Sequence, residues 1–280
     1  MTDAPRDPEE LEATGAPVDG PLPDATRMGT VHLGVADLTR SVGYYQSALG
    51  LQVHRSEGGR AALGAGGEDL LLLTERPGAR PARGVSGLYH FALLVPERRD
   101  LARFLAHAAR DSVPLTGLSD HYVSEAIYLR DPDEHGIEVY WDRPRSVWEG
   151  EVGERLTTEP LDVDSLLGEL EDPRTEPWET LAAGTVMGHV HLRVGDVPAA
   201  TEFYRELGFA LMAQLGRQAA FLAAGGYHHH IGANSWESAG AGFAEEGTAT
   251  LERMTIVVPG LEGERSLRDP SGNPVVLMPS

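Results

Sequence analysis

Three side chains that could take part in chemistry lie close together in the sequence: His121, Tyr128 and Glu138. A segment rich in turn-forming residues, 131–136, separates the last two. The β-branched and aromatic residues on each side of this turn predict two strands. In the second strand Glu138 points away from the face of its two apolar neighbours, so its carboxylate belongs either to a solvated face or to a site.

Composition excludes several kinds of chemistry and several kinds of partner. The chain of 280 residues has a formal net charge of −20, which disfavours nucleic acids and anionic membrane surfaces as partners. Without cysteine it has no disulfide, thiolate metal site or Cys nucleophile, and without lysine it has no Schiff base or P-loop lysine. The sequence contains neither a long apolar run nor a signal-peptide pattern, so we expect a cytoplasmic protein.

Strand and helix patterns recur along the chain. Residues 28–35 predict a strand that is followed by a helix and three short strands, and a second such unit begins with the strand at 88–95. Residues 187–194 align without a gap on 28–35 and begin a third unit. A shortened fourth unit has strands at 253–258 and 274–278. The repeat predicts an α+β fold of four βαβββ modules in two pairs.

The same pattern predicts the domain organisation. Residues 1–26 are acidic and rich in Pro, which is typical of a disordered tail. We expect an N-terminal domain with a metal site at 27–145, a linker at 146–184 with a short helix at 162–169, and a C-terminal domain with a degenerate site at 185–280.

Paired modules predict a cleft in which the first strands and one last strand meet. In the first pair these strands offer His32, His90 and Glu138, and the two histidines hold matching places in their units. Two imidazoles and one carboxylate on one side of a divalent metal form the facial triad of non-haem Fe(II) oxygenases. The same ligands also suit Mn(II) and Zn(II).

The second pair lacks this ligand set, because Arg253 and Val276 replace the second His and the Glu. We therefore expect it to have lost the metal. The run of three histidines at 228–230 leaves two interpretations open: His229 meets His191 as a weak metal or ligand site, or the run forms an interdomain polar network. The remaining histidines are expected to be surface or structural residues: His54, His107, His135 and His189.

The spacing from His121 through Tyr128 and Asp131-Pro132 to Glu138 resembles the signature of type I extradiol ring-cleavage dioxygenases, within the vicinal oxygen chelate superfamily. Over residues 28–280 the chain is most similar to catechol 2,3-dioxygenase-like two-domain proteins. It departs from well-studied members, which have their metal in the C-terminal pair, because the expected triad here lies in the N-terminal pair.

The resemblance implies a function. Fe(II) would bind His32, His90 and Glu138, and the substrates would be a catechol-type aromatic and O₂, as in aromatic compound catabolism. His121 would be the acid/base, and Tyr128 would hydrogen-bond a substrate oxygen. Proteins with this fold often associate, so a homodimer is among the expected assemblies.

Two other functions remain compatible with the sequence. The first is a glyoxalase-like metal-dependent isomerase or thiol transferase, whose members usually lack a pair like His121 and Tyr128. The second is a non-enzymatic member of the same fold that binds small molecules, against which the complete ligand set argues.

Overall fold

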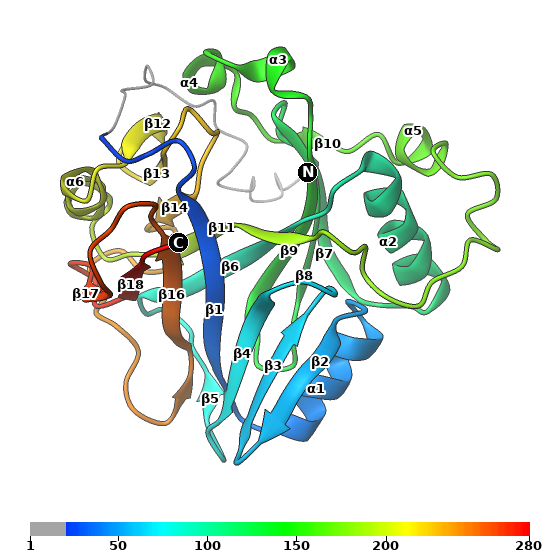
Figure 1. The fold of residues 1–280 in the computed structure, drawn as a ribbon, viewed down its shortest axis with the longest axis horizontal. Helices are drawn as coiled ribbons and strands as arrows, with labels where there is room; N and C mark the ends of the chain where they lie inside the picture. The colour runs from blue at the N-terminus through cyan, green and yellow to red at the C-terminus, as the bar shows by residue number, and fades with distance from the viewer. Residues whose placement is uncertain (1–20) are drawn as a thin grey trace, which may run out of the picture.

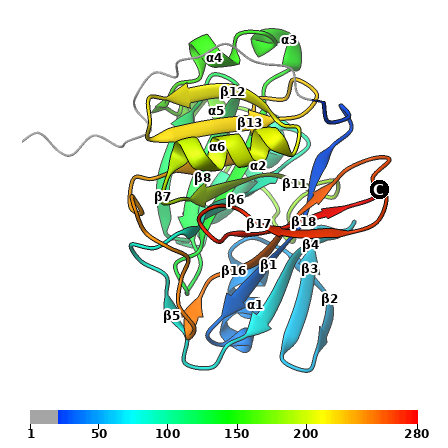
Figure 2. The ribbon, with the colours of Figure 1, turned by 90° about the vertical axis from the view of Figure 1, so that its left-hand side faces the viewer.

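The computed structural model describes residues 21–280, which form two curved sheets with helices packed against them (Figures 1 and 2). The helices are α1 (Leu38–Ser47), α2 (Arg98–Arg110), α3 (Arg145–Trp148), α4 (Val152–Arg155), α5 (Val163–Leu167) and α6 (Val197–Glu206). No helix among these residues is long and apolar enough to cross a membrane.

The first sheet comprises β1 (Arg27–Val35), β2 (Gln52–Glu57), β3 (Arg60–Gly64), β4 (Asp69–Glu75), β16 (Leu251–Val257), β17 (Arg265–Arg268) and β18 (Pro274–Met278). Its strand order is β17-β18-β16-β1-β4-β3-β2. Strands from the two ends of the described chain therefore lie side by side, which Figure 1 shows as blue β1 next to orange β16.

The second sheet comprises β6 (Gly87–Leu94), β7 (Leu115–Asp120), β8 (Ser124–Arg130), β9 (Gly136–Asp142), β10 (Glu159–Pro160), β11 (Val186–Arg193), β12 (Ala210–Leu215), β13 (Ala219–Ala223) and β14 (Ile231–Asn234). Its order is β10-β7-β8-β9-β6-β11-β14-β13-β12. A small separate ladder pairs β5 (Arg80–Pro81) with β15 (Thr248–Ala249).

The expected modules are present, but the expectation that the first and second modules share a cleft is wrong. The first module pairs with the fourth through antiparallel β1 and β16, and the second pairs with the third through antiparallel β6 and β11. The sequence repeat identifies modules, yet the first strand of each is an open edge that can pair with any other. His32 and His90 consequently lie in different sheets.

Side-chain caps hold the first turn of the helix in each of the three modules that have one. The side chain of Asp37 caps α1 by accepting a hydrogen bond from the Arg40 N–H at 2.9 Å, and Asp196 caps α6 through the Ala199 N–H at 3.0 Å. In α2 the N-cap is Glu97, and the carboxylate of Asp100 accepts from the Glu97 N–H at 3.2 Å.

The turn before β9 is held by the buried carboxylate of Asp131. One of its oxygens accepts hydrogen bonds from the backbone N–H groups of Asp133 at 2.9 Å and His135 at 2.8 Å. The other accepts from the Tyr45 hydroxyl at 2.9 Å, which ties the turn to α1. This network fixes where β9 begins and hence which face Glu138 takes.

Residues 146–184 form more than a connection between two halves. They contain α3, α4, β10 and α5, and β10 extends the second sheet by pairing with β7. The expected helix is α5, with Asp162 as its N-cap. Residues 1–20 of the expected tail lie outside the described residues, while the Leu22 N–H donates to the Gly208 carbonyl at 3.2 Å. The predicted domain boundaries stay a prediction.

The close approach of β9 to β6 makes Gly136 a sensitive position. A Cβ there would lie 2.0 Å from the Tyr89 carbonyl oxygen, so Gly136→Ala should lower the free energy of unfolding by about 1–3 kcal/mol in urea titrations. Gly43→Ala is the matched control, because no atom lies within 4 Å of that position in α1 and alanine should stabilise the helix by about 0.5–1 kcal/mol. Wild-type stability of Gly136→Ala would contradict this strand packing.

Candidate metal centre

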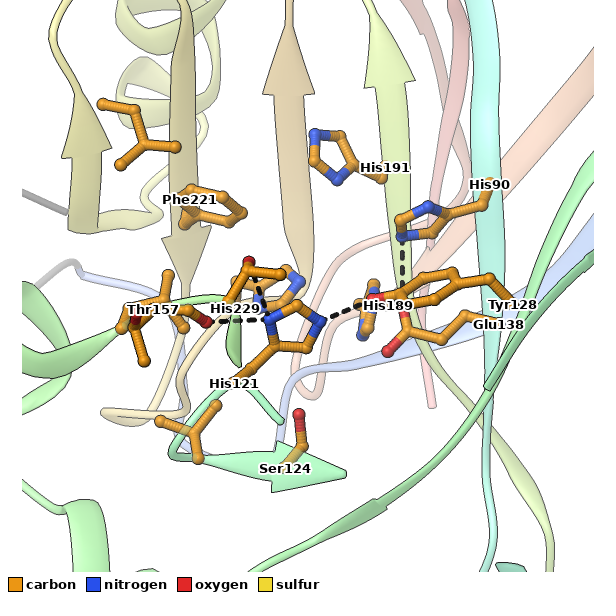
Figure 3. Close-up of a pocket in the computed structure, with 14 residues that line it drawn as sticks. His90, His121, Ser124, Tyr128, Glu138, Thr157, His189, His191, Phe221 and His229 are labelled. Atoms are coloured by element: carbon orange, nitrogen blue, oxygen red, sulfur yellow. Dashed lines mark hydrogen bonds and ion pairs between the residues drawn. The ribbon is translucent and has the colours of Figure 1, made fainter. Parts of the chain in front are cut away.

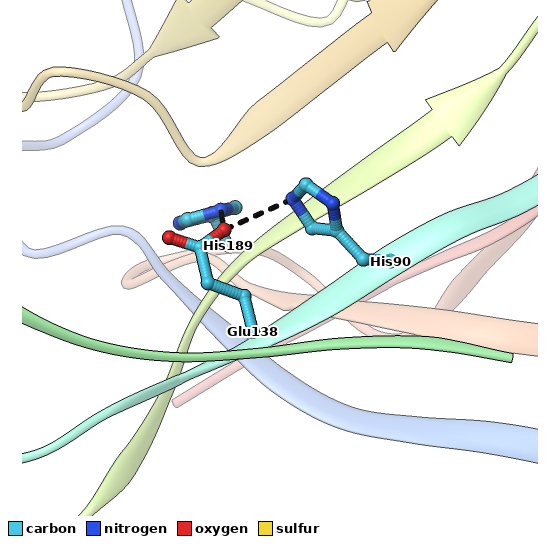
Figure 4. Close-up of side chains that lie close together, drawn as sticks. All are labelled: His90, Glu138 and His189. Carbon is cyan, nitrogen blue, oxygen red and sulfur yellow. Dashed lines mark hydrogen bonds and ion pairs between the residues drawn. The ribbon is translucent and has the colours of Figure 1, made fainter. Parts of the chain in front are cut away.

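Three buried side chains converge on one point: His90 from β6, Glu138 from β9 and His189 from β11 (Figure 4). Their candidate ligand atoms all lie within 4.8 Å of one another. The same Glu138 oxygen, Oε2, lies 3.1 Å from His90 Nε2 and 2.9 Å from His189 Nε2. Two imidazole nitrogens and one carboxylate oxygen could therefore bind one divalent ion from the same side.

The strand order explains this convergence, because β9, β6 and β11 are consecutive neighbours in the second sheet. β6 and β9 run parallel and β6 and β11 run antiparallel. Phe91 and Val190 pair across β6 and β11, are fully buried and face the core. Side chains alternate between the faces of a strand, so the neighbouring histidines face the opposite side.

The charges of the three side chains fit a metal site. Burial alone would raise the pKa of Glu138, but the adjacent imidazoles of His189 and His90 hold that pKa well below its ordinary value. Burial lowers the pKa of His189, which favours its neutral ring. Metal binding needs an ionised carboxylate and neutral imidazoles, so the directions found for Glu138 and His189 both suit it.

The structure does not bring His32 to this group. Its Nε2 lies 2.7 Å from Thr74 Oγ1 and 3.2 Å from Glu252 Oε2, within the first sheet. Its neighbour across the β1–β16 pair is Arg253. The structure therefore brings together only part of the expected ligand set: His90 and Glu138 lie together, and His189, not His32, lies beside them.

The sequence pattern did not identify His189 as a candidate ligand, although a signal for it exists. Segments 90–95 and 189–194 each run from a His to the Val that directly follows the strand. In the first module Thr30 holds the corresponding place in 30–35. Alignment on the strand end, rather than on the nearest His, pairs His90 with His189.

His121 and Tyr128 lie beside the three donors. The His121 Nδ1–H donates to the Thr157 carbonyl at 2.9 Å, so the neutral ring accepts at Nε2, and the Tyr128 hydroxyl donates to it at 2.7 Å. Burial lowers the pKa of His121, which favours that neutral ring. Tyr128 is the direct cross-strand neighbour of Glu138. The Thr157 contact shows that segment 146–184 takes part in the site.

These side chains line a concave, partly apolar cleft of the kind that small molecules occupy (Figure 3). Its lining combines polar groups with four apolar side chains, which are Val123, Leu156, Leu215 and Phe221. His191 also lines it, and its buried Nε2 has no hydrogen-bond partner among the described residues. The cleft thus offers apolar contacts and several polar groups to a small molecule.

The three histidines at 228–230 belong to the surroundings of this cleft rather than to a second one. The ring centroid of His229 lies 4.1 Å from that of His189, and His229 lines the cleft. Burial lowers the pKa of His229 well below its ordinary value. β11 and β14 lie in the same sheet as β6, which explains why residues expected in a separate site meet His189.

Metal analysis distinguishes the group that the structure brings together, His90, Glu138 and His189, from the expected set with His32. His189→Ala removes one of three donors and should weaken binding of Fe(II) or Zn(II) by at least about 10²-fold, because losing a mere supporting contact already costs 10–100-fold. His32→Ala, the matched control, should bind metal like the wild type. Metal lost from His32→Ala and kept by His189→Ala would refute the assignment.

Comparisons with known proteins agree with this architecture. Residues 27–139 and 186–255 match the family described as the Glyoxalase/Bleomycin resistance protein/Dioxygenase superfamily. A catechol-2,3-dioxygenase from Bacillus subtilis (strain 168) is 41% identical over 244 residues, which cover 85% of this chain and 84% of that protein.

Solved structures share the fold at low sequence identity. Glyoxalase I from Zea mays has a TM-score of 0.55 at 18% identity, over 91% of this chain and 92% of that one. A Bacillus subtilis protein provisionally called a dioxygenase has a TM-score of 0.59 at 12% identity, over 90% of this chain and 84% of that one. Strand order, family match and the 41% identical relative lead to one conclusion: the chain belongs to the Glyoxalase/Bleomycin resistance protein/Dioxygenase superfamily.

Proposed function

We propose that this enzyme binds Fe(II) through His90, Glu138 and His189 and opens the ring of a catechol next to its two hydroxyl groups, with O₂ as co-substrate. The observation that carries the proposal is the 2.7 Å hydrogen bond between Tyr128 and His121 at the edge of the donor group. It provides a proton acceptor and a hydroxyl donor where a substrate oxygen would lie.

The donor set and the relative both support this reaction. Two imidazoles and one carboxylate leave coordination positions free, as in non-haem Fe(II) oxygenases. The relative that is 41% identical is a catechol-2,3-dioxygenase. When bound, Fe(II) would lower the pKa of a catechol hydroxyl and hold both reactants close together.

The chain's own residues would handle the protons. The Thr157 carbonyl holds the proton of neutral His121 on Nδ1. The Nε2 lone pair therefore becomes available once the Tyr128 hydroxyl hydrogen-bonds a substrate instead of His121. His121 Nε2 would then accept a proton from one catechol hydroxyl, and Tyr128 would donate a hydrogen bond to a substrate oxygen. Burial lowers the pKa of His121, which favours the neutral ring that this exchange needs.

The reaction needs no further reductant. The carbon–carbon bond beside the diol breaks, both atoms of O₂ enter the product, and the catechol supplies the electrons. The product is a hydroxymuconic semialdehyde. The apolar wall formed by Val123, Leu215 and Phe221 would contact the part of the ring away from the hydroxyls. The His121–Tyr128 pair favours this reaction over a glyoxalase-like isomerisation.

An assay of ring cleavage tests the proposal. Protein purified without oxygen and loaded with Fe(II) should convert catechol or an alkyl-substituted catechol to a yellow product in the presence of O₂. His90→Ala should form none because it lacks a metal ligand. A wild type that holds Fe(II) but cleaves none of a panel of catechols would reject the proposed function. The homodimer and the cytoplasmic location stay predictions.

Tyr128→Phe separates hydrogen bonding from metal binding. The variant keeps the ring but loses the hydroxyl next to His121, so kcat should fall by about 10–10²-fold while Fe(II) content stays at the wild-type level. Tyr44→Phe is a control, since that hydroxyl donates to the Arg130 carbonyl outside the cleft. Equal kcat values for Tyr128→Phe and Tyr44→Phe would exclude the role given to Tyr128.

A further inference from the structure

A hydrogen-bonded chain of buried side chains leads from the end of β9 to the cleft. His228 Nε2 lies 2.8 Å from Asp142 Oδ1, and His228 Nδ1 lies 2.7 Å from His229 Nδ1. His228 is fully buried, and His229 lines the cleft against the ring of His189. The chain thus connects a carboxylate at the end of β9 to an imidazole next to the candidate metal ligands.

The direction of each hydrogen bond follows from the carboxylate. A carboxylate only accepts, so the His228 Nε2–H must donate to Asp142. With a neutral His228 ring, Nδ1 carries a lone pair, and the proton of the next bond comes from His229 Nδ1. In the neutral His229 ring this leaves Nε2 unprotonated, and no other described side chain hydrogen-bonds that ring.

The far oxygen of Asp142 is also held. The Tyr227 hydroxyl donates to Asp142 Oδ2 at 2.8 Å, and the Tyr140 hydroxyl lies 2.7 Å from the Tyr227 hydroxyl. Burial raises the pKa of both tyrosines well above the ordinary value, so both keep their protons. Two donors on one carboxylate prevent it from turning away from His228.

We propose that Asp142 and His228 are positioning residues that fix the tautomer of His229, so that His229 presents an unprotonated Nε2 to the cleft as a hydrogen-bond acceptor. This inference rests on the proposed function for its catalytic meaning: the acceptor would bind a substrate hydroxyl in addition to His121. The tautomer itself depends only on the hydrogen bonds of the folded chain.

Two substitutions at His228 separate bonding from packing. The Gln amide in His228→Gln donates on one side and accepts on the other, as neutral His228 does, whereas His228→Leu does neither. With catechol, kcat should fall by about 10²-fold in His228→Leu and by less than about tenfold in His228→Gln. Metal content should stay at the wild-type level in both, because neither change replaces one of the three candidate metal ligands.

His230→Leu is the matched control. His230 lies two residues after His228 and is also buried. It accepts a hydrogen bond from the Ala224 N–H at 3.2 Å and takes no part in the chain from Asp142 to His229. Its loss should lower the melting temperature but leave kcat close to the wild type. Equal losses of kcat in all three variants would assign His228 a packing role and overturn the proposal.

Nitrogen-15 NMR of histidine-labelled, zinc-loaded full-length protein reads the tautomer without any reaction. We expect His229 protonated at Nδ1 in the wild type and in His228→Gln, and a shift toward the Nε2-protonated form in His228→Leu. A wild-type His229 protonated at Nε2 would overturn the proposal. Because this measurement needs no turnover, it decides the inference even if the protein cleaves no catechol and the proposed function fails.

Discussion

The antiparallel pairing of β6 with β11 is the contact on which the candidate site depends. It places His90 beside His189, two residues far apart in the sequence, while β9 on the other side of β6 supplies Glu138. Phe91 and Val190 bury the opposite face of the same strands. Side chains alternate between the two faces of a strand, so burying Phe91 and Val190 on one face also determines that His90 and His189 lie on the other.

Part of this arrangement could be predicted from the sequence because it is local. The repeat of strand, helix and strands identifies the modules, and the turn at Asp131 places Glu138 on the strand that pairs with β8. The spacing from His121 to Glu138 therefore carries real geometric information: the structure brings His121, Tyr128 and Glu138 to one cleft.

The remainder could not be predicted, because it depends on which modules pair. His32 resembles a ligand as strongly as His90 does, yet β1 pairs with β16 and lies in the other sheet. His189 has the pattern of a structural histidine in the sequence, because only the pairing of β11 with β6 brings it beside His90. Thr157 supplies only a backbone carbonyl to His121, and any residue type can supply that atom, so the sequence holds no signal for it.

The interleaved strand order has a consequence for the order of events during synthesis. The N-terminal half, which leaves the ribosome first, contains His90 and Glu138 but leaves β1 and β6 without their partners β16 and β11. Neither sheet is complete until strands near the end of the chain have been made. The three candidate metal ligands therefore meet only after the C-terminal half has joined, so a half-made chain offers an ion no complete set of these ligands.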